Sequence, residues 1–289
     1  MDFPISLNKN ETKLFLASAV TLYFELLVIR YLPTEVRVFT NLKNLPLISS
    51  FFGMGLGMLL GGSSRRVRIV FPFAGAALFV LTRFAVPLHL SVGDVSWSYG
   101  LSLSEGPFSR RVLVAWFLAI AISFSGLAII FFRVLGGFVG ESLKPIPALR
   151  GYGINLAGSS AGMALFSLLA FLRTGPAIWL LAGFLLLFTF VARDRVAIPV
   201  FSLAVLLVAA PQPNTFWSPY YRIDLIQLPA PAGWSLASAY SLVSNHSWYQ
   251  WIIDLSPDFV KRYPAASPNR IVAPYYELPY ELEIGRAHV

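Results

Sequence analysis

Seven apolar runs fill the first 210 residues of the chain and limit its possible folds more than any other feature. The runs cover residues 13–32, 45–62, 69–90, 111–134, 152–172, 176–192 and 196–210. A helix of about 20 residues spans the roughly 30 Å hydrocarbon core of a bilayer. We therefore expect an all-α polytopic membrane bundle of six or seven transmembrane helices, in which 196–210 is the shortest segment and contains Pro199.

The composition favours a lipid bilayer as the partner of this chain. Only 12% of the residues are charged, whereas a soluble domain carries about 25%. The net charge of +8 would suggest nucleic acid in a soluble protein. Here the basic residues lie in short loops between apolar runs, which is typical of cytoplasmic anchoring and argues against nucleic acid.

Cysteine and histidine usage excludes several kinds of site. The chain has no cysteine, which rules out disulfides, thiolate metal sites and cysteine nucleophiles. His89, His246 and His288 lie far apart in sequence, so no metal site is expected. No small-residue cleavage site follows the first apolar run, which we interpret as a retained span instead of a signal peptide.

The composition changes near residue 211, where several prolines occur. Three segments that follow, YYRIDLIQL, SLASAYSLVS and SWYQWIIDL, have the pattern of short strands. We expect residues 1–210 to form a transmembrane domain and residues 211–282 to begin a soluble domain with a small β-subdomain of two to four strands. Because a hairpin alone is marginally stable, this piece should rest on a partner domain or on the membrane domain.

The last seven residues, EIGRAHV, match the in-frame translation of a common sequencing-library adapter. We expect residues 283–289 to be a non-native tail and the natural sequence to continue beyond Leu282. An ordinary short C-terminus is the alternative.

Glycines recur in the apolar runs at helix-packing spacing. Gly53, Gly55 and Gly57 superficially match a dinucleotide loop, but no strand precedes them and their flanks are apolar. Small residues let membrane helices approach closely. The same interpretation applies to the pairs Gly57/Gly61, Gly136/Gly140 and Gly158/Gly162.

Polar side chains inside the runs are the intramembrane candidates. Glu25 should face the bundle interior and pair with Arg30 or with a basic residue of another helix; an ion or proton pathway is the alternative. Arg30 is also close enough to the end of its span to snorkel. Asn155, Ser159 and Ser160 predict interhelical hydrogen bonds, or otherwise the lining of a cavity.

The order of several motifs carries a family resemblance. In the runs these are FELLVIRYLP, SSFFGMGLGMLLGG and GYGINLAGSSAGMALFSLL, and in the tail WSPYYRIDL, NHSWYQ and YYELPYEL. The chain resembles the membrane-anchored, spermidine-synthase-like proteins of bacteria, in which a multi-span domain precedes an aminopropyltransferase-like domain. The resemblance implies polyamine biosynthesis, with decarboxylated S-adenosylmethionine or S-adenosylmethionine as cofactor and a polyamine or other amine as substrate of the parent.

The resemblance also implies substrate-binding positions, and these are Ser218, Tyr220, Gln250, Tyr275 and Glu277. Asn245 lies where the family has an acidic residue or asparagine. Tyr221 and Tyr276 replace a glutamine and a histidine of the family, which puts polyamine specificity in doubt. No catalytic residue is expected in this fragment, because the nucleoside loop and the proton-accepting aspartate should follow it. As written, the chain is expected to be inactive.

The functional prediction is thus the membrane domain and the start of a spermidine-synthase-like transferase, in the bacterial inner membrane. The rival is an integral membrane transporter or structural protein with an accessory tail. Ten basic residues in the N-terminal segment and even-numbered loops, against six opposite, place the N-terminus in the cytoplasm. A cytoplasmic tail then requires six full spans, with 196–210 re-entrant or lying in the interface.

Overall fold

The computed structural model describes residues 8–36, 38–39, 42–60, 65–84, 110–227, 239–253 and 261. Within them lie seven helices: α1 (Lys9–Glu35), α3 (Leu45–Leu60), α4 (Arg65–Arg83), α5 (Arg110–Leu143), α6 (Ala148–Phe171), α7 (Pro176–Val191) and α8 (Ala197–Val208). Four strands follow: β1 (Thr215–Trp217), β2 (Arg222–Gln227), β3 (Ala239–Ser244) and β4 (Ser247–Ile253). The chain forms two compact units, 1–212 with Trp217–Tyr221, and 213–216 with 222–289. A helical chain with a small C-terminal sheet confirms the coarse prediction.

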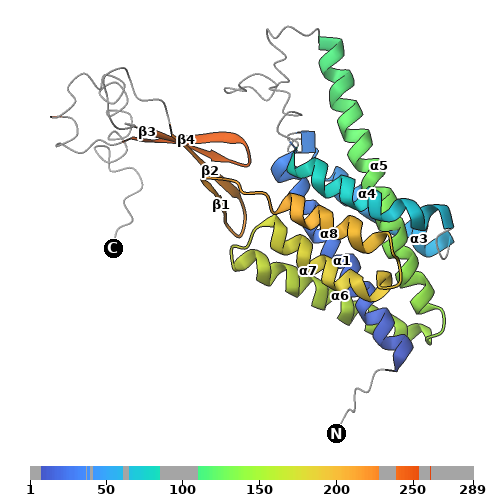
Figure 1. The fold of residues 1–289 in the computed structure, drawn as a ribbon. Coiled ribbons are helices and arrows are strands. Elements are labelled where there is room, and N and C mark those ends of the chain that lie inside the picture. Colours follow the sequence, from blue (N-terminus) through green and yellow to red (C-terminus); the bar gives the residue numbers. More distant parts are fainter. Residues whose placement is uncertain are drawn as a thin grey trace. The chain divides into compact units, whose positions relative to one another are not determined.

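Helix α1 is the central element of the helical unit. It packs against α3, α4, α5, α6 and α7, and Figure 1 shows it, in blue, running among the other helices. Its most apolar stretch is 61% buried, against 28% for α5 and 22% for α6. Asn8 begins the helix with a capping box, accepting from the Glu11 amide at 3.0 Å while Glu11 accepts from the Asn8 amide at 2.9 Å.

Glycines set the closest helix contacts, as the sequence predicts. A Cβ added at Gly53 or Gly57 of α3 would collide with the α5 backbone at Ile129 or Arg133. A Cβ added at Gly162 of α6 would likewise collide with the α1 carbonyl of Ala19. These helices therefore touch backbone to backbone, which is how small residues associate helices where hydrocarbon surrounds them.

The outward faces of the helices are apolar. Three helical segments, Lys9–Glu35, Val114–Leu143 and Ala148–Phe171, are long and apolar enough to cross a membrane, while α3, α7, α8 and Ile69–Arg83 of α4 are shorter apolar helices. Large side chains are exposed around the bundle, among them Leu59, Ile122, Leu149, Phe171 and Leu206, each at 69% or more. Water-soluble monomers rarely expose apolar surface on this scale.

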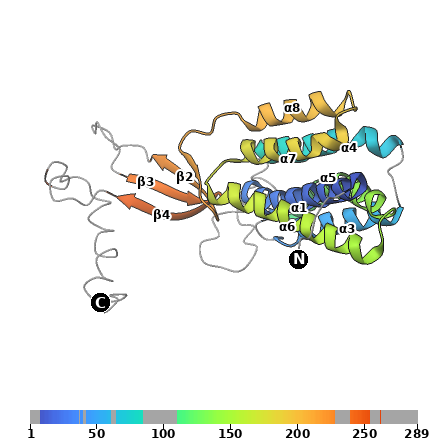
Figure 2. The same ribbon diagram turned by 90° about the horizontal axis from the view of Figure 1, so that it is seen from below.

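Helix α8 covers most of 196–210, the segment that the sequence predicts to be re-entrant or to lie in the interface. It packs along α4 and α7, as Figure 2 shows, and Arg83, the last residue of α4, donates to the Ala210 carbonyl at 2.9 Å. Arg30, near the end of α1, holds residues 218 and 219. The chain therefore leaves α8 at the end of the bundle opposite to Lys9, because the 27 residues of α1 separate the two ends by roughly 40 Å.

The second unit contains the antiparallel sheet, whose strand order is β1-β2-β3-β4. Leu225 lies opposite Leu242, which in turn lies opposite Gln250. Asn245 and His246 connect β3 to β4 with φ values of 47° and 60°, the left-handed pair typical of a two-residue hairpin turn. Four strands agree with the predicted two to four.

Candidate functional site

The most specific polar arrangement in the helical unit surrounds Arg30. Its Nη2 donates to the Ser218 carbonyl at 2.5 Å, and its Nη1 donates to the Pro219 carbonyl. The guanidinium also lies 4.8 Å from the centre of the Trp179 ring. Carbonyl acceptors bind both terminal nitrogens of this planar cation and an aromatic face covers it, without a carboxylate, while its buried Nε has no hydrogen-bond partner among the described residues.

The turn at 218–221 presents those carbonyls because of its own sequence. The Ser218 hydroxyl accepts from the amides of Tyr220 and Tyr221 at 3.2 and 2.8 Å, and the Ser218 amide donates to the Tyr221 carbonyl at 2.8 Å. Pro219 has no amide hydrogen to satisfy. The turn is therefore closed internally, and the carbonyls of its first two residues remain available to Arg30.

Aromatic rings hold the same turn against the bundle. The Trp217 ring lies 5.1 Å from Trp179 and 6.3 Å from Tyr31. Trp179 is itself fixed, since its Nε1 donates to Thr174 at 2.8 Å and its carbonyl accepts from the Tyr23 hydroxyl at 2.7 Å. We call Arg30, Trp179, Trp217 and the turn 218–221 the connector clamp.

Glu25 is buried, as predicted, but it does not form the predicted pair. It is 3% exposed, and its Oε2 has no hydrogen-bond partner among the described residues. No ion pair joins it to Arg30 or to another basic residue of the described ranges. The terminal nitrogens of Arg30 instead donate to the carbonyls of Ser218 and Pro219, which lie 188 and 189 positions later in the chain. Spacing within one helix could not indicate these partners.

A second polar link joins α1 to α6, and it was only partly predicted. The Ser18 hydroxyl donates to Asn155 at 2.6 Å, which confirms the interhelical hydrogen bond expected of Asn155. Arg150 pairs with Glu11 at 2.6 Å, a contact that the sequence analysis missed. Both features have a structural role in helix packing.

Of the substrate-binding residues implied by the family resemblance, Ser218 and Tyr220 lie in one turn of the helical unit, and Gln250 lies in the other compact unit. Ser218 serves the turn described above, and Tyr220 is 79% exposed beside it. Gln250 is exposed on β4, in the other compact unit. Tyr275 and Glu277 lie outside the described residues, as do residues 283–289. Within the described ranges no group of acidic, histidine or cysteine side chains could hold a metal ion.

Comparisons with known proteins return no match, whether with protein-family models, curated proteins or solved structures.

Proposed function

We propose that residues 1–212 form a multi-pass membrane anchor of the bacterial inner membrane. The observation that carries the proposal is the number of large apolar side chains exposed on the helices, above all on α5 and α6, whose most apolar stretches are only 28% and 22% buried. Inside a bilayer such side chains contact lipid tails, which are equally apolar, at no cost in free energy. In water the same side chains would drive aggregation. Helix α8, with 12 residues, rises only about 18 Å, and local thinning of the bilayer accommodates the mismatch.

In this proposal the chain leaves the anchor, at residues 218–221, on the side of the membrane opposite to the N-terminus. The distribution of basic residues supports this topology. Six of them lie at the N-terminal end of the bundle, namely Lys9, Lys13, Lys144, Arg150, Arg193 and Arg195. Helix α4 also begins with the sequence RRVR. The positive-inside rule then makes this end cytoplasmic. This proposal differs from the cytoplasmic tail expected from the sequence, because α8 leads the chain away from the N-terminal end of the bundle.

Membrane extraction tests the anchor. After an alkaline carbonate wash, the full chain should remain in the membrane pellet and should float with lipid in a sucrose gradient. Flotation is the control for aggregation, because an aggregate also pellets after the carbonate wash but stays at the bottom of the sucrose gradient. Recovery of the chain in the carbonate supernatant would contradict membrane insertion.

A second candidate is the membrane domain of a spermidine-synthase-like transferase, favoured by the order of motifs from FELLVIRYLP to YYELPYEL. That candidate needs the C-terminal side in the cytoplasm, where nucleoside cofactors are available, and so places the N-terminus outside. Reading the coding sequence beyond Leu282 tests it. A glycine-rich turn between a strand and a helix would support the transferase, and an immediate stop codon would contradict it.

A further inference from the structure

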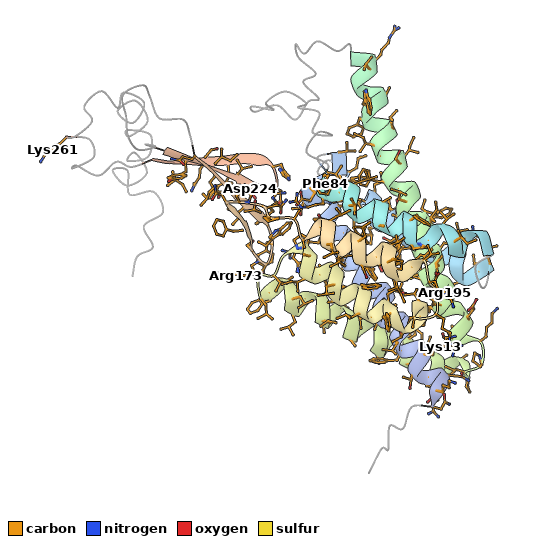
Figure 3. All side chains as sticks on the ribbon, viewed as in Figure 1. Lys13, Phe84, Arg173, Arg195, Asp224 and Lys261 are labelled. Atoms are coloured by element: carbon orange, nitrogen blue, oxygen red, sulfur yellow. The ribbon has the colours of Figure 1, made fainter. Side chains whose placement is uncertain are left out.

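A cavity of about 850 Å³ opens at the N-terminal end of the helical unit, between α1, α5 and α7. Lys9 and Lys13 come from the first turns of α1, and Arg193 follows the end of α7. Glu141 is the single carboxylate among the lining residues, so the lining carries two net positive charges. Figure 3 shows Lys13 at this end of the bundle, well away from Arg173 and Phe84 at the other.

The three cations are available to a ligand. Their side chains are exposed, and within the described ranges none of them forms an ion pair or side-chain hydrogen bond. By contrast, the nearby Arg150 is held by Glu11. A cavity whose cations have no carboxylate partner favours an anion that approaches from outside the protein.

Part of the cavity wall is apolar, which restricts the kind of anion. Phe138 of α5 and Phe190 of α7 are stacked with ring centres 4.9 Å apart and planes at 17°, and both line the cavity. An occupant of this cavity therefore meets cations at the end of the bundle and apolar surface along its side.

We propose that this cavity binds one anionic phospholipid of the leaflet at the N-terminal end. The phosphate contacts Lys9, Lys13 and Arg193, and an acyl chain lies along Phe138 and Phe190. Basic pockets between transmembrane helices on the cytoplasmic side are known to hold anionic headgroups. The volume also falls within the range of roughly 300–1,000 Å³ that is usual for ligand sites. The inference rests on the proposed membrane insertion.

The test uses the full chain purified in a nonionic detergent. Its melting temperature is followed while phosphatidylglycerol, phosphatidylethanolamine with the same acyl chains, or inorganic phosphate is added. We expect phosphatidylglycerol alone to raise the melting temperature. The triple variant Lys9→Gln, Lys13→Gln, Arg193→Gln should bind it roughly a hundredfold more weakly, since each cation near a headgroup contributes about fivefold.

The matched control removes three cations from the other end of the bundle, through Lys43→Gln, Arg111→Gln and Arg173→Gln. It should respond to phosphatidylglycerol like the native chain. Equal losses in both triple variants, or an equal response to both lipids, would overturn the proposal. A response to inorganic phosphate alone would also overturn it, by showing a simple anion site.

Two further measurements keep the test decisive. If the triple variant does not fold, Lys13→Gln should weaken phosphatidylglycerol binding and Lys13→Arg should restore it, whereas equal binding by both would overturn the proposal. Flotation of the chain in its native membranes, before detergent is added, separates the two proposals. A chain that floats but shows no lipid preference refutes only the lipid site, and a chain that does not float refutes membrane insertion.

Discussion

The guanidinium of Arg30 lies 4.8 Å above the ring of Trp179, joining the last turns of α1 to the first turn of α7. The same guanidinium holds the carbonyls of Ser218 and Pro219. One side chain of the central helix therefore fixes both a neighbouring helix and the segment through which the chain leaves the bundle. This makes Arg30 the most informative single position for mutation.

Replacing Arg30 should release the turn at 218–221. Arg30→Ala loses two charge-assisted hydrogen bonds and the ring contact, at a cost of about 2 kcal/mol to the helical unit. Arg30→Lys should recover only part of it, because an ammonium cannot reach two carbonyls as a planar fork does. Limited proteolysis measures the release as faster cleavage after Tyr220 or Tyr221. Arg111→Ala, exposed on α5, is the control, and equal cleavage in both variants would contradict the clamp.

The glycine contacts predict opposite outcomes for two neighbouring positions. Gly57→Ala should destabilise the bundle by about 1–3 kcal/mol, because its Cβ would press on the α5 backbone at Arg133 and Gly137. Gly55→Ala should be neutral or slightly stabilising, since nothing lies within 4 Å of a Cβ there and alanine favours the helix. Thermal unfolding in detergent compares the two, and similar melting temperatures would argue against close α3–α5 packing.

Glu25 and Glu11 should respond to the same substitution with opposite sign. Glu25→Gln replaces a buried carboxyl group whose Oε2 has no partner in the described residues, so it should leave stability unchanged or raise it by about 1 kcal/mol. Glu11→Gln removes the anion paired with Arg150 and should lower stability by a similar amount. Unfolding of the two variants under identical conditions provides the comparison. A loss on Glu25→Gln would indicate that its charge has a role.

The helices, most of the strands and the closest helix contacts could be predicted, because each depends on a pattern within a short stretch of sequence. The apolar runs gave the helices, alternation gave β2 to β4, and glycine spacing gave the α3–α5 and α1–α6 contacts. Helix α5 continues to Leu143, beyond the predicted 134. The extension contains Gly136 and Gly140, which pack against Met54 and Met58 of α3, a contact that a count of apolar residues along one segment does not reveal.

The candidate site could not be predicted in the same way, because its contacts join distant parts of the chain. Arg30 meets a turn 188 residues later, and the basic cavity combines Lys13 with Arg193. A charged residue in an apolar run signals that a partner is needed, but it does not say which residue supplies it. The packing of α8 on α4 and α7 is a contact of the same kind, which the short length of 196–210 and its Pro199 do not indicate.

The most direct test of the central claim is the side of the membrane on which each end of the bundle lies. The chain has no cysteine, so Arg195→Cys and Tyr220→Cys each introduce one reactive thiol at an exposed position. A membrane-impermeant maleimide is added to spheroplasts before and after permeabilisation. We predict labelling of Tyr220→Cys in intact spheroplasts and of Arg195→Cys only after permeabilisation. Labelling of both variants in intact spheroplasts, or of neither before permeabilisation, would contradict a bundle that crosses the membrane from Lys9 to Tyr220.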